Sequence, residues 1–338
     1  MQTKVKVIAE IGVNHNGNID LAFQLIDAAK SAGADMVKFQ IFKAERLASK
    51  NSAKAIYQAK NNPNETQYEM LKKLELSAKQ YEDILSYCKE IKIDCIASAF
   101  DIDDINFLLK SGQKVFKIPS GEIINIPYLR HIGKNASSVI MSTGMATMKE
   151  IKNAISILKK EGIQDRNLSL LHCTSEYPAP MDELNLNVIK MFKSFFGLRV
   201  GYSDHSIGTE VSIAAVALGA TIIEKHFTLD KKLPGPDHKA SIEKKDLTIL
   251  VKAIKNIELA LGKANKNPSE SEQKNLSIVR QFIIAKNIIK KGDVLNNINL
   301  SSMRTGHGIS VKYWDNVSGT KAIKDFNVNE IIVTDDKF

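Results

Sequence analysis

Eight short apolar runs, rich in β-branched residues, recur before residue 230 and alternate with longer segments of helical period. They lie at residues 5–9, 36–39, 95–97, 115–118, 138–141, 168–171, 198–200 and 221–223. Between them, apolar residues three and four positions apart predict helices, for example over residues 78–91, 148–160 and 183–195. Strands that alternate with helices predict a parallel sheet, and eight such units predict a closed (β/α)8 TIM barrel.

A doubly wound open sheet is the alternative fold, because periodicity alone does not prove that the sheet closes. Such a sheet normally has fewer units and begins with a glycine-rich turn of the form GxGxxG. The first turn of this chain, residues 12–17, reads Gly-Val-Asn-His-Asn-Gly and has a different glycine spacing. The sequence therefore favours the barrel.

The length of 338 residues suits a barrel of about 250 residues followed by a small second domain. After the last predicted barrel helix, the composition becomes polar and turn-rich over residues 263–277. Beyond this segment, strand-like runs at residues 282–285 and 331–333 are separated by glycine-containing turns. We therefore expect a barrel over residues 1–262, a linker over 263–277 and a small β-rich domain over 278–338.

Composition argues against several classes of protein. No run approaches the roughly 20 apolar residues of a membrane-spanning helix, and no signal-peptide pattern precedes the first apolar run, so we expect a cytoplasmic protein. Cys88, Cys95 and Cys173 have no short paired spacing, which argues against a disulfide framework or a structural zinc site. The net charge of +9 comes from scattered lysines, so we expect no nucleic-acid partner and relate the positive field to an anionic substrate.

Reactive side chains in barrel enzymes lie at the carboxyl ends of the strands. Polar residues lie in or after all eight apolar runs of this chain. They are Glu10 and Asn14; Lys38 and Gln40; Ser98; Lys117, Ser120 and Glu122; Ser142 and Thr143; His172, Ser175 and Tyr177; Ser203, Asp204 and His205; and Glu224, His226 and Asp237. Their shared register predicts a polar site at the mouth of the barrel.

His205 and His226 end neighbouring predicted strands, which brings two imidazoles to the same rim of the barrel. A lone histidine after a strand is more often structural than a ligand, but two at one rim predict a metal site. Two nitrogens completed by oxygen ligands suit an exchangeable divalent ion better than a closed thiolate zinc site. We expect Mn²⁺, with Mg²⁺ or Co²⁺ as alternatives, and Glu122 as the carboxylate nearest to a metal-bound water.

Lys38 and Lys117 lie within predicted strands, where an inward lysine is costly unless an anion pairs with it. Hydroxyls near them come from Ser98, Ser120, Ser142 and Ser203. Together these groups predict a cradle for a phosphate and a carboxylate. Two alternatives stay open for Lys117: a structural ion pair with Glu10 or Glu122, and a Schiff-base lysine as in pyruvate aldolases. Lys225 can alternate outward, and of the three lysines it is the weakest candidate for a chemical role.

Eight motifs in order make this chain similar to a known family. They are residues 9–17 AEIGVNHNG, 37–40 VKFQ, 117–122 KIPSGE, 142–145 STGM, 172–178 HCTSEYP, 201–205 GYSDH, 224–228 EKHFT and 234–237 PGPD. They closely resemble the motifs of the sialic acid synthase family, which includes bacterial N-acetylneuraminate and legionaminate synthases. The resemblance covers nearly the whole chain. It implies a barrel followed by a domain similar to type III antifreeze protein, an SAF domain, from about residue 278.

The resemblance also implies roles for particular residues. His205 and His226 look like the manganese ligands, and Glu122 and Glu10 look like catalytic carboxylates. The phosphoenolpyruvate pocket would comprise Lys38, Ser98, Lys117, Ser120, Ser142, Ser175 and Ser203. The sugar would contact Glu10, Gln40, Tyr177, Asp237 and Arg304. In such enzymes the SAF domain covers the barrel mouth of the neighbouring subunit in a domain-swapped homodimer, so Arg304 would grip the sugar in its partner's site.

Three positions depart from the family pattern. The third-strand motif, residues 97–100, reads Ala-Ser-Ala-Phe, which keeps a hydroxyl but loses a methyl group. Thr305 replaces the usual proline after Arg304, so this loop lacks the rigidity that proline gives. Ser175 stands where some members have asparagine, so one phosphate contact would be shorter or bridged by water.

The resemblance implies a transferase that joins phosphoenolpyruvate to an N-acetylated amino sugar with cleavage of the C–O bond to phosphate. The first expectation is N-acetylmannosamine as acceptor and N-acetylneuraminate as product. The alternative is 2,4-diacetamido-2,4,6-trideoxymannose as acceptor and N,N'-diacetyllegionaminate as product, because both kinds of enzyme share these motifs. A Schiff-base pyruvate aldolase and a non-catalytic carbohydrate-binding barrel stay open as functions of other classes.

Overall fold

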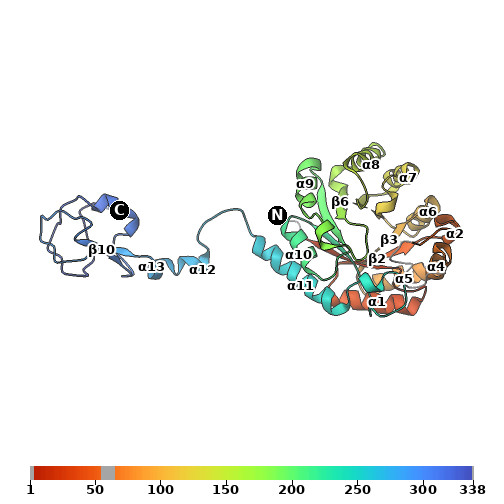
Figure 1. Ribbon diagram of the computed structural model, residues 1–338, viewed down its shortest axis with the longest axis horizontal. Coiled ribbons are helices and arrows are strands. Elements are labelled where there is room, and N and C mark those ends of the chain that lie inside the picture. Colours follow the sequence, from red (N-terminus) through yellow and green to blue (C-terminus); the bar gives the residue numbers. More distant parts are fainter. Residues whose placement is uncertain (1–3, 55–64, 337–338) are drawn as a thin grey trace. The chain divides into compact units, whose positions relative to one another are not determined.

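The structure is a computed structural model that describes residues 4–54 and 65–336. The chain divides into two compact units, Met1–Gly262 and Lys263–Phe338. The first unit is a ring of strands surrounded by helices, and the second unit contains a small separate sheet (Figure 1).

Eight strands of the described residues form the sheet of the first unit. They are β1 (Lys6–Gly12), β2 (Met36–Ile41), β3 (Asp94–Ala99), β4 (Val115–Ile118), β5 (Ser138–Ser142), β6 (Leu168–Cys173), β7 (Arg199–Asp204) and β8 (Ile222–His226). Their order is β3-β2-β1-β8-β7-β6-β5-β4, and neighbours in this order pair in parallel. β3 and β4 contact each other, although no ladder of the described residues joins them. The (β/α)8 TIM barrel is therefore confirmed over the open doubly wound sheet.

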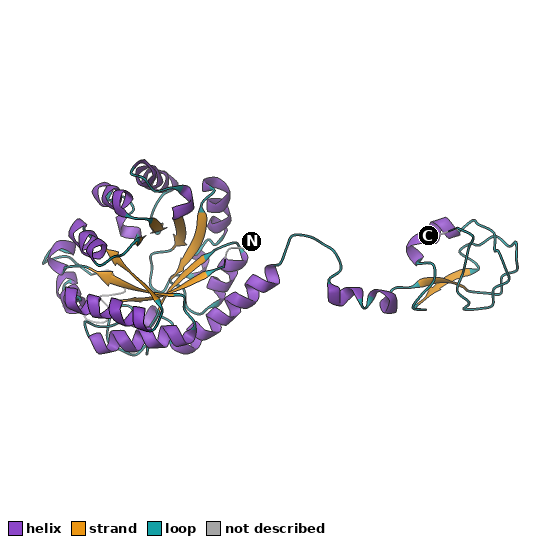
Figure 2. Ribbon diagram, turned by 180° about the vertical axis from the view of Figure 1, so that it is seen from behind, coloured by secondary structure: helices purple, strands orange, loops and turns teal. Residues whose placement is uncertain are grey.

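Helices follow the strands and cover the outside of the barrel (Figure 2). They are α1 (Ile19–Ala32), α2 (Ala44–Leu47), α4 (Gln67–Leu74), α5 (Ala78–Glu90), α6 (Ile102–Lys110), α7 (Ile126–Asn135), α8 (Met148–Lys160), α9 (Asn187–Phe196), α10 (Glu210–Ala217) and α11 (Lys244–Leu261). Local sequence signals fix several helix boundaries. Ser77 caps the amino end of α5 and Thr147 caps that of α8, each in a capping box. Gly33 ends α1 with a φ of 90°, a conformation that glycine adopts without strain. Among the described residues, no helix is both long and apolar enough to cross a membrane.

The inside of the barrel has an apolar layer with a polar layer above it. The apolar layer consists of Ile8, Met36, Ile96, Ile140, Leu171 and Ile222, all of which are buried. Because side chains alternate along a strand, the residue two positions later also points inward, one layer nearer the carboxyl end. These residues are Glu10 after Ile8, Lys38 after Met36, Ser98 after Ile96, Ser142 after Ile140 and Glu224 after Ile222. Hydrophobic packing therefore fills the barrel below, and polar side chains gather at its mouth.

The second unit has its own hydrophobic core, which includes the buried residues Ile283, Leu300 and Phe326. Its sheet consists of two antiparallel strands, β9 (Phe282–Ala285) and β10 (Leu300–Met303). The strand predicted at residues 282–285 is thus present.

Residues 331–333, the other predicted strand, form only a single bridge, between Ile331 and Ile284. Two one-turn helices, α12 (Glu270–Gln273) and α13 (Leu276–Val279), lie at or near the stretch that the sequence predicts as a linker. A third, α14 (Trp314–Val317), lies between the sheet and the carboxyl end.

Candidate active site

A cavity of about 340 Å³, which we call the mouth pocket, opens at the carboxyl ends of the barrel strands. Its lining contains Glu10, Lys38, Gln40, Lys117, Ser120, Ser142, Ser175, Tyr177, Ser203, His205, His226 and Asp237, all of which the sequence predicted. Of the residues with a predicted catalytic or binding role, Ser98, Glu122 and Arg304 are not part of this lining. Asn14, Thr143, His172 and Asp204, which were expected at the mouth from their register, are not part of it either. Ser98 nevertheless lies next to it, with its hydroxyl 3.5 Å from the Lys38 ammonium.

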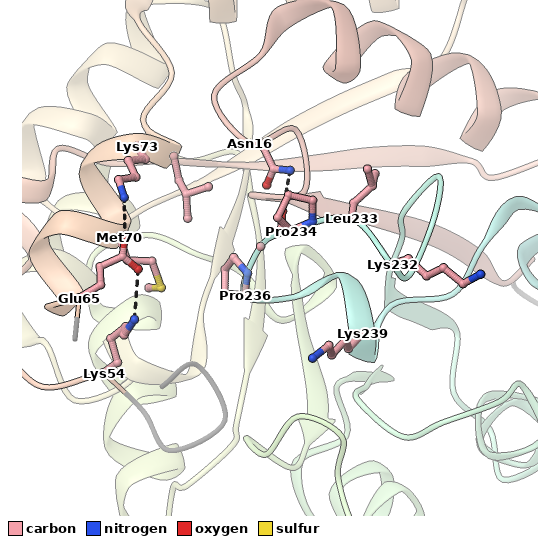
Figure 3. Close-up of a pocket in the computed structure, with 12 residues that line it drawn as sticks. Asn16, Lys54, Glu65, Met70, Lys73, Lys232, Leu233, Pro234, Pro236 and Lys239 are labelled. Atoms are coloured by element: carbon pink, nitrogen blue, oxygen red, sulfur yellow. Dashed lines mark hydrogen bonds and ion pairs between the residues drawn. The ribbon is translucent and has the colours of Figure 1, made fainter. Parts of the chain in front are cut away.

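A second cavity, of about 600 Å³, lies beside the mouth pocket and shares Met70, Leu74 and Pro236 with it. Figure 3 shows its lining, in which the Glu65 carboxylate pairs with the Lys73 ammonium. In the described part of the chain, none of the predicted site residues lines this larger cavity. The reactive groups therefore gather in the smaller one.

Two lysines and two glutamates form a buried network in the mouth pocket. Lys38 Nζ lies 2.7 Å from Glu10 Oε2 and 3.9 Å from Glu224 Oε1. Lys117 Nζ lies 3.4 Å from the same Glu224 oxygen. Lys117 thus pairs with Glu224, and not with Glu10 or Glu122, the two partners considered from the sequence. The Glu224 carboxylate stands between two ammonium groups.

Burial and neighbouring charges act in opposite directions on this network. Burial raises the pKa of Glu10, and the Lys38 ammonium offsets this effect only in part. Burial lowers the pKa of Lys117, and the Glu224 carboxylate opposes this shift without cancelling it. Burial also disfavours the charged form of Lys38, but Glu10 and Glu224 outweigh it and raise the pKa of Lys38. Lys38 therefore stays charged, and Lys117 is the more easily neutralised of the two.

Hydroxyl groups surround the lysines. Ser203 donates a hydrogen bond to Glu224 Oε1 at 3.1 Å, and Ser120 Oγ accepts one from the backbone N–H of Gly144 at 3.0 Å. The buried hydroxyl of Ser142 has no hydrogen-bond partner among the described residues. A buried polar atom without a partner is costly, so Ser142 is available to a polar ligand.

Two imidazole rings lie at one side of the pocket, with the ring centres of His205 and His226 5.4 Å apart. His205 Nδ1 donates to the carbonyl oxygen of Thr174 at 2.7 Å, which leaves Nε2 of the neutral ring as an acceptor. His226 Nδ1 is buried without a hydrogen-bond partner among the described residues and lies 3.8 Å from Asp237 Oδ2. The ring of Tyr177 stacks on His205, with ring centres 4.0 Å apart.

The histidine pair fits an exchangeable divalent ion. Burial lowers the pKa of His226 well below its usual value, and the neutral imidazole is the form that binds metals. The pKa of His205 is raised, because Cys173 and the Thr174 carbonyl outweigh the opposing effect of burial. At low pH a metal would therefore compete with a proton at this ring. No three His, Cys, Asp or Glu side chains of residues 4–54 and 65–336 converge as a ready ligand set. Two protein ligands leave coordination positions for substrate and water.

Behind the histidine pair, Asp204 and Lys225 form a buried ion pair that faces α10. The two residues are partners in the ladder between β7 and β8. Lys225 Nζ lies 2.8 Å from both Asp204 Oδ2 and the carbonyl oxygen of Ser206. Asp204 Oδ1 in turn accepts from the backbone N–H and the hydroxyl of Ser206. Lys225 therefore points outward, as predicted, and this network fixes the strand ends from which the two histidines project.

Glu122 ends a one-turn 3-10 helix, η1 (Ser120–Glu122), where its carboxylate accepts a hydrogen bond from Asn125 at 2.6 Å. Burial raises the pKa of Glu122. Because Glu122 does not line the mouth pocket, the structure does not bring it together with the histidine pair.

Arg304 belongs to the second unit and is exposed. The hydroxyl of Thr305, the residue that stands in place of a proline, donates to the carbonyl oxygen of His307 at 2.6 Å. This bond closes the loop locally and replaces part of the restraint that a proline would give.

Sequence reasoning gave no role to Glu224 and did not find the apolar part of the pocket lining. The two-residue spacing between Glu224 and His226 was the available signal, because it makes both side chains point inward. The apolar part consists of Val13, Met70, Leu71, Leu74 and Phe100. It carries no such signal, since apolar residues at helical spacing read like an ordinary core helix.

The fold and the site together define a TIM-barrel enzyme whose mouth combines buried lysines, hydroxyls and a histidine pair, a set suited to an anionic substrate and a divalent ion. The chain belongs to the NeuB family, whose model matches residues 25–266.

Relatives of known name cover nearly the whole chain. The chain is 47% identical to the N,N'-diacetyllegionaminic acid synthase of Campylobacter jejuni, over 97% of this chain and 99% of that protein. It is 43% identical to the N,N'-diacetyllegionaminic acid synthase of Legionella pneumophila, over 93% of this chain and 89% of that protein. The crystal structure of N-acetylneuraminic acid (sialic acid) synthetase from Leptospira borgpetersenii in complex with citrate aligns with a TM-score of 0.72 at 36% identity, over 81% of this chain and 90% of that chain.

Proposed function

We propose that this protein is an N,N'-diacetyllegionaminate synthase, which condenses phosphoenolpyruvate with 2,4-diacetamido-2,4,6-trideoxymannose and water and releases phosphate. The two relatives at 47% and 43% identity carry that name, whereas the similar sialic acid synthetase is 36% identical. The comparisons thus favour the second acceptor expected from the sequence over N-acetylmannosamine. The observation that carries the reaction class is the mouth pocket, where two buried lysines and two imidazoles face one cavity.

Phosphoenolpyruvate matches the charged part of the pocket. Lys38 and Lys117 supply two ammonium groups, and hydrogen bonds from ammonium to phosphate or carboxylate are about twice as strong as neutral ones. Glu10 and Glu224 hold these ammonium groups in place. Further donors to the phosphate and the carboxylate would be Ser98, Ser120, Ser142, Ser175 and Ser203.

We assign His205 and His226 as ligands of a divalent ion, Mn²⁺ in first place and Mg²⁺ or Co²⁺ as alternatives. When bound, the ion would act as a Lewis acid toward the aldehyde of the open-chain sugar. The chain orients both rings in advance: His205 by its hydrogen bond to Thr174, and His226 by edge-to-face packing on Tyr177 with ring centres 5.4 Å apart. Such support of a ligand by its neighbours is typical of functional metal sites.

The reaction forms a bond between the methylene carbon of phosphoenolpyruvate and the aldehyde carbon of the sugar. Water adds to the neighbouring enol carbon, and the C–O bond to phosphate breaks. Glu10, Gln40, Tyr177 and Asp237 line the same pocket and would bind the sugar hydroxyls. Glu10 accepts a hydrogen bond from Gln40 at 3.0 Å, and we assign proton transfer at the sugar oxygen to this carboxyl. Glu122, the second catalytic carboxyl expected from the sequence, does not line this pocket, so we assign no proton transfer to it.

We also propose that the second unit is an SAF domain and that Arg304 acts in the mouth pocket of a partner subunit. The similarity to the Campylobacter jejuni relative supports this proposal, because it extends over 99% of that protein and so includes its carboxyl-terminal part.

The first test is to incubate the protein with phosphoenolpyruvate, Mn²⁺ and each of the two acceptor sugars separately, and to follow phosphate release and product mass. We expect phosphate and a product of the mass of N,N'-diacetyllegionaminate with the trideoxy sugar. Phosphate with N-acetylmannosamine alone would overturn the acceptor but keep the reaction. No phosphate with either sugar, together with a lysine adduct trapped by borohydride in the presence of pyruvate, would replace the synthase by an aldolase.

A further inference from the structure

Several apolar residues of the mouth pocket gather around α4. Val13, Met70, Leu71, Leu74 and Phe100 form this group, which we call the apolar wall. Val13 follows β1, Phe100 follows β3, and the other three residues lie on α4. The serine hydroxyls that line the pocket come instead from β4 to β7 and the loops that follow them. Pro119 and Met145 also line the pocket among these serines, so the wall is the larger apolar part of the lining and not its only one.

The apolar wall is formed before any ligand binds. Met70 and Leu74 are only 7% and 6% exposed, and they pack with Val13 and Phe42 in a hydrophobic cluster of their own. The rings of Phe42 and Phe100 meet edge to face, with ring centres 6.0 Å apart. A preformed apolar surface favours ligands that place methyl groups against it, because no ordering of the protein opposes binding.

Helix α4, which supplies most of the apolar wall, is tied to the barrel by polar contacts outside the pocket. Glu75, the residue after α4, accepts a hydrogen bond from the backbone N–H of Ala44 at 2.8 Å and pairs with Lys43 at 3.1 Å. Thr66 and Glu69 close a capping box at the other end of the helix. The carboxyl end of α4 is therefore tied to the segment that follows β2, and its amino end is closed by a local capping box.

We propose that the apolar wall is the subsite for the two methyl groups that distinguish 2,4-diacetamido-2,4,6-trideoxymannose from N-acetylmannosamine, namely the C6 methyl and the methyl of the 4-acetamido group. This inference rests on the proposed synthase function. N-acetylmannosamine carries hydroxyls at C4 and C6. A hydroxyl against the wall loses its water without gaining a hydrogen bond, whereas a methyl group is buried favourably.

The polar residues determine which end of the sugar meets the apolar wall. The aldehyde carbon has to face the side of His205 and His226, where the proposed reaction takes place. Glu10 lies on β1 and Gln40 on β2, the strands that precede Val13 and α4 of the apolar wall. In this arrangement the two side chains bind the middle of the sugar. Carbons C4 to C6 then extend toward α4.

The test compares kcat/KM for three acceptors at fixed phosphoenolpyruvate and Mn²⁺: the diacetamido trideoxy sugar, 6-deoxy-N-acetylmannosamine and N-acetylmannosamine. One methylene group in an apolar pocket changes kcat/KM by about 10- to 200-fold, so we expect kcat/KM to fall by about tenfold or more at each step of this series. Leu71→Gln should lower kcat/KM for the diacetamido sugar by about tenfold or more relative to that for N-acetylmannosamine, because the amide offers the hydroxyls of N-acetylmannosamine a hydrogen-bond partner. Phe100→Tyr should act in the same direction with little change in side-chain volume.

Leu109→Gln is the matched control, because Leu109 is also a partly buried leucine on a helix but does not line the pocket. It should leave the preference among the three sugars unchanged. Equal kcat/KM for all three sugars with the wild type, or a parallel loss for all three in Leu71→Gln and Phe100→Tyr, would overturn the role of the apolar wall while the synthase function stands. No phosphate release from any of the three sugars would overturn the proposed function itself.

Discussion

The Asp204 carboxylate and the Lys225 ammonium lie 2.8 Å apart in a buried ion pair that joins the ends of β7 and β8. Lys225→Met should lower the free energy of unfolding by about 3–5 kcal/mol, because it leaves the Asp204 charge buried without its partner. Urea denaturation measures this loss. The double variant Asp204→Asn, Lys225→Met removes both charges and should recover most of the stability.

An exposed ion pair provides the comparison for this prediction. Lys79 and Asp83 pair across one turn of α5, and the side chain of Lys79 is 77% exposed. Lys79→Met should therefore cost far less stability than Lys225→Met. A similar loss of stability in Lys79→Met and Lys225→Met would contradict the importance of the buried pair.

His205→Ala and His226→Ala should each abolish Mn²⁺ binding and phosphate release together, because each variant removes one of the two assigned ligands. Electron paramagnetic resonance of free Mn²⁺ during a titration measures the binding without relying on activity. His131→Ala is the control: this ring contacts Asn106 on the outer helices, so both properties should persist. Full phosphate release by the wild type in metal-free buffer with a chelator would rule out the metal assignment.

Lys117→Met should raise KM for phosphoenolpyruvate by about 10- to 100-fold, because a hydrogen bond to a charged group contributes about 1.5–3 kcal/mol. Steady-state kinetics with varied phosphoenolpyruvate measures this change. Lys232→Met, on the rim of the larger cavity, should leave KM within about twofold of the wild type. If Lys117→Met kept the wild-type KM, Lys117 would not contact the phosphoenolpyruvate anion.

Mixing two inactive variants should restore activity if Arg304 acts in the partner's site. Arg304→Ala keeps an intact barrel, and His205→Ala keeps an intact Arg304. In a mixed dimer, the intact barrel receives the intact arginine, so phosphate release should rise above that of either variant alone after the two are unfolded and refolded together. Activity that stays at the sum of the separate variants would exclude the swapped arrangement.

Acid should destabilise the protein through buried histidines. Burial is the main cause that lowers the pKa of His15 and of His238 to about 4, whereas a histidine in the unfolded chain takes up its proton near pH 6.5. Their contribution to stability is therefore fully present above pH 6.5 and is lost as the pH falls toward 4, by up to about 3 kcal/mol for His15. Urea denaturation at several pH values between about 7 and 4.5 should show this fall.

Acidic residues whose pKa is raised by burial act in the opposite sense over part of this range, and Asp104 is one of them. Burial raises the pKa of Asp104 to about 7, so its contribution to stability grows as the pH falls from 7 toward 4. Comparing wild type with His15→Asn cancels this effect, since Asp104 is common to both. The pH dependence should be shallower in His15→Asn, and an unchanged dependence would show that His15 is not responsible.

The barrel could be predicted because each strand carries its own signal, a short β-branched run between helical segments. The strands of the second unit were harder to predict from the sequence. Its strand β10 reads Leu-Ser-Ser-Met, with two serines between its only apolar residues, so neither composition nor alternation marks it as a strand. Its pairing with β9 comes from contacts distant in sequence, which a local pattern does not contain.

Much of the polar site could be predicted from register, because inward-pointing side chains at the strand ends gather at the barrel mouth. Asp204 is an exception, since it ends β7 but points outward to Lys225. The ion-pair partners of these side chains could not be predicted from register. Lys117 lies on β4 and its partner Glu224 on β8, and only the closed barrel sets the distance between them. The position of Glu122 depends on the turn η1, whose geometry the sequence motif does not reveal.

The apolar wall belongs to a hydrophobic cluster that is distinct from the main core of the barrel and from the apolar layer inside it. Substitutions there leave the packing that holds the barrel together untouched. Under the proposed role of the wall, a few changes in α4 would exchange one acceptor sugar for another while the lysines and histidines of the mouth pocket stay the same. The same separation makes α4 the place to begin when redesigning the enzyme for an unnatural sugar.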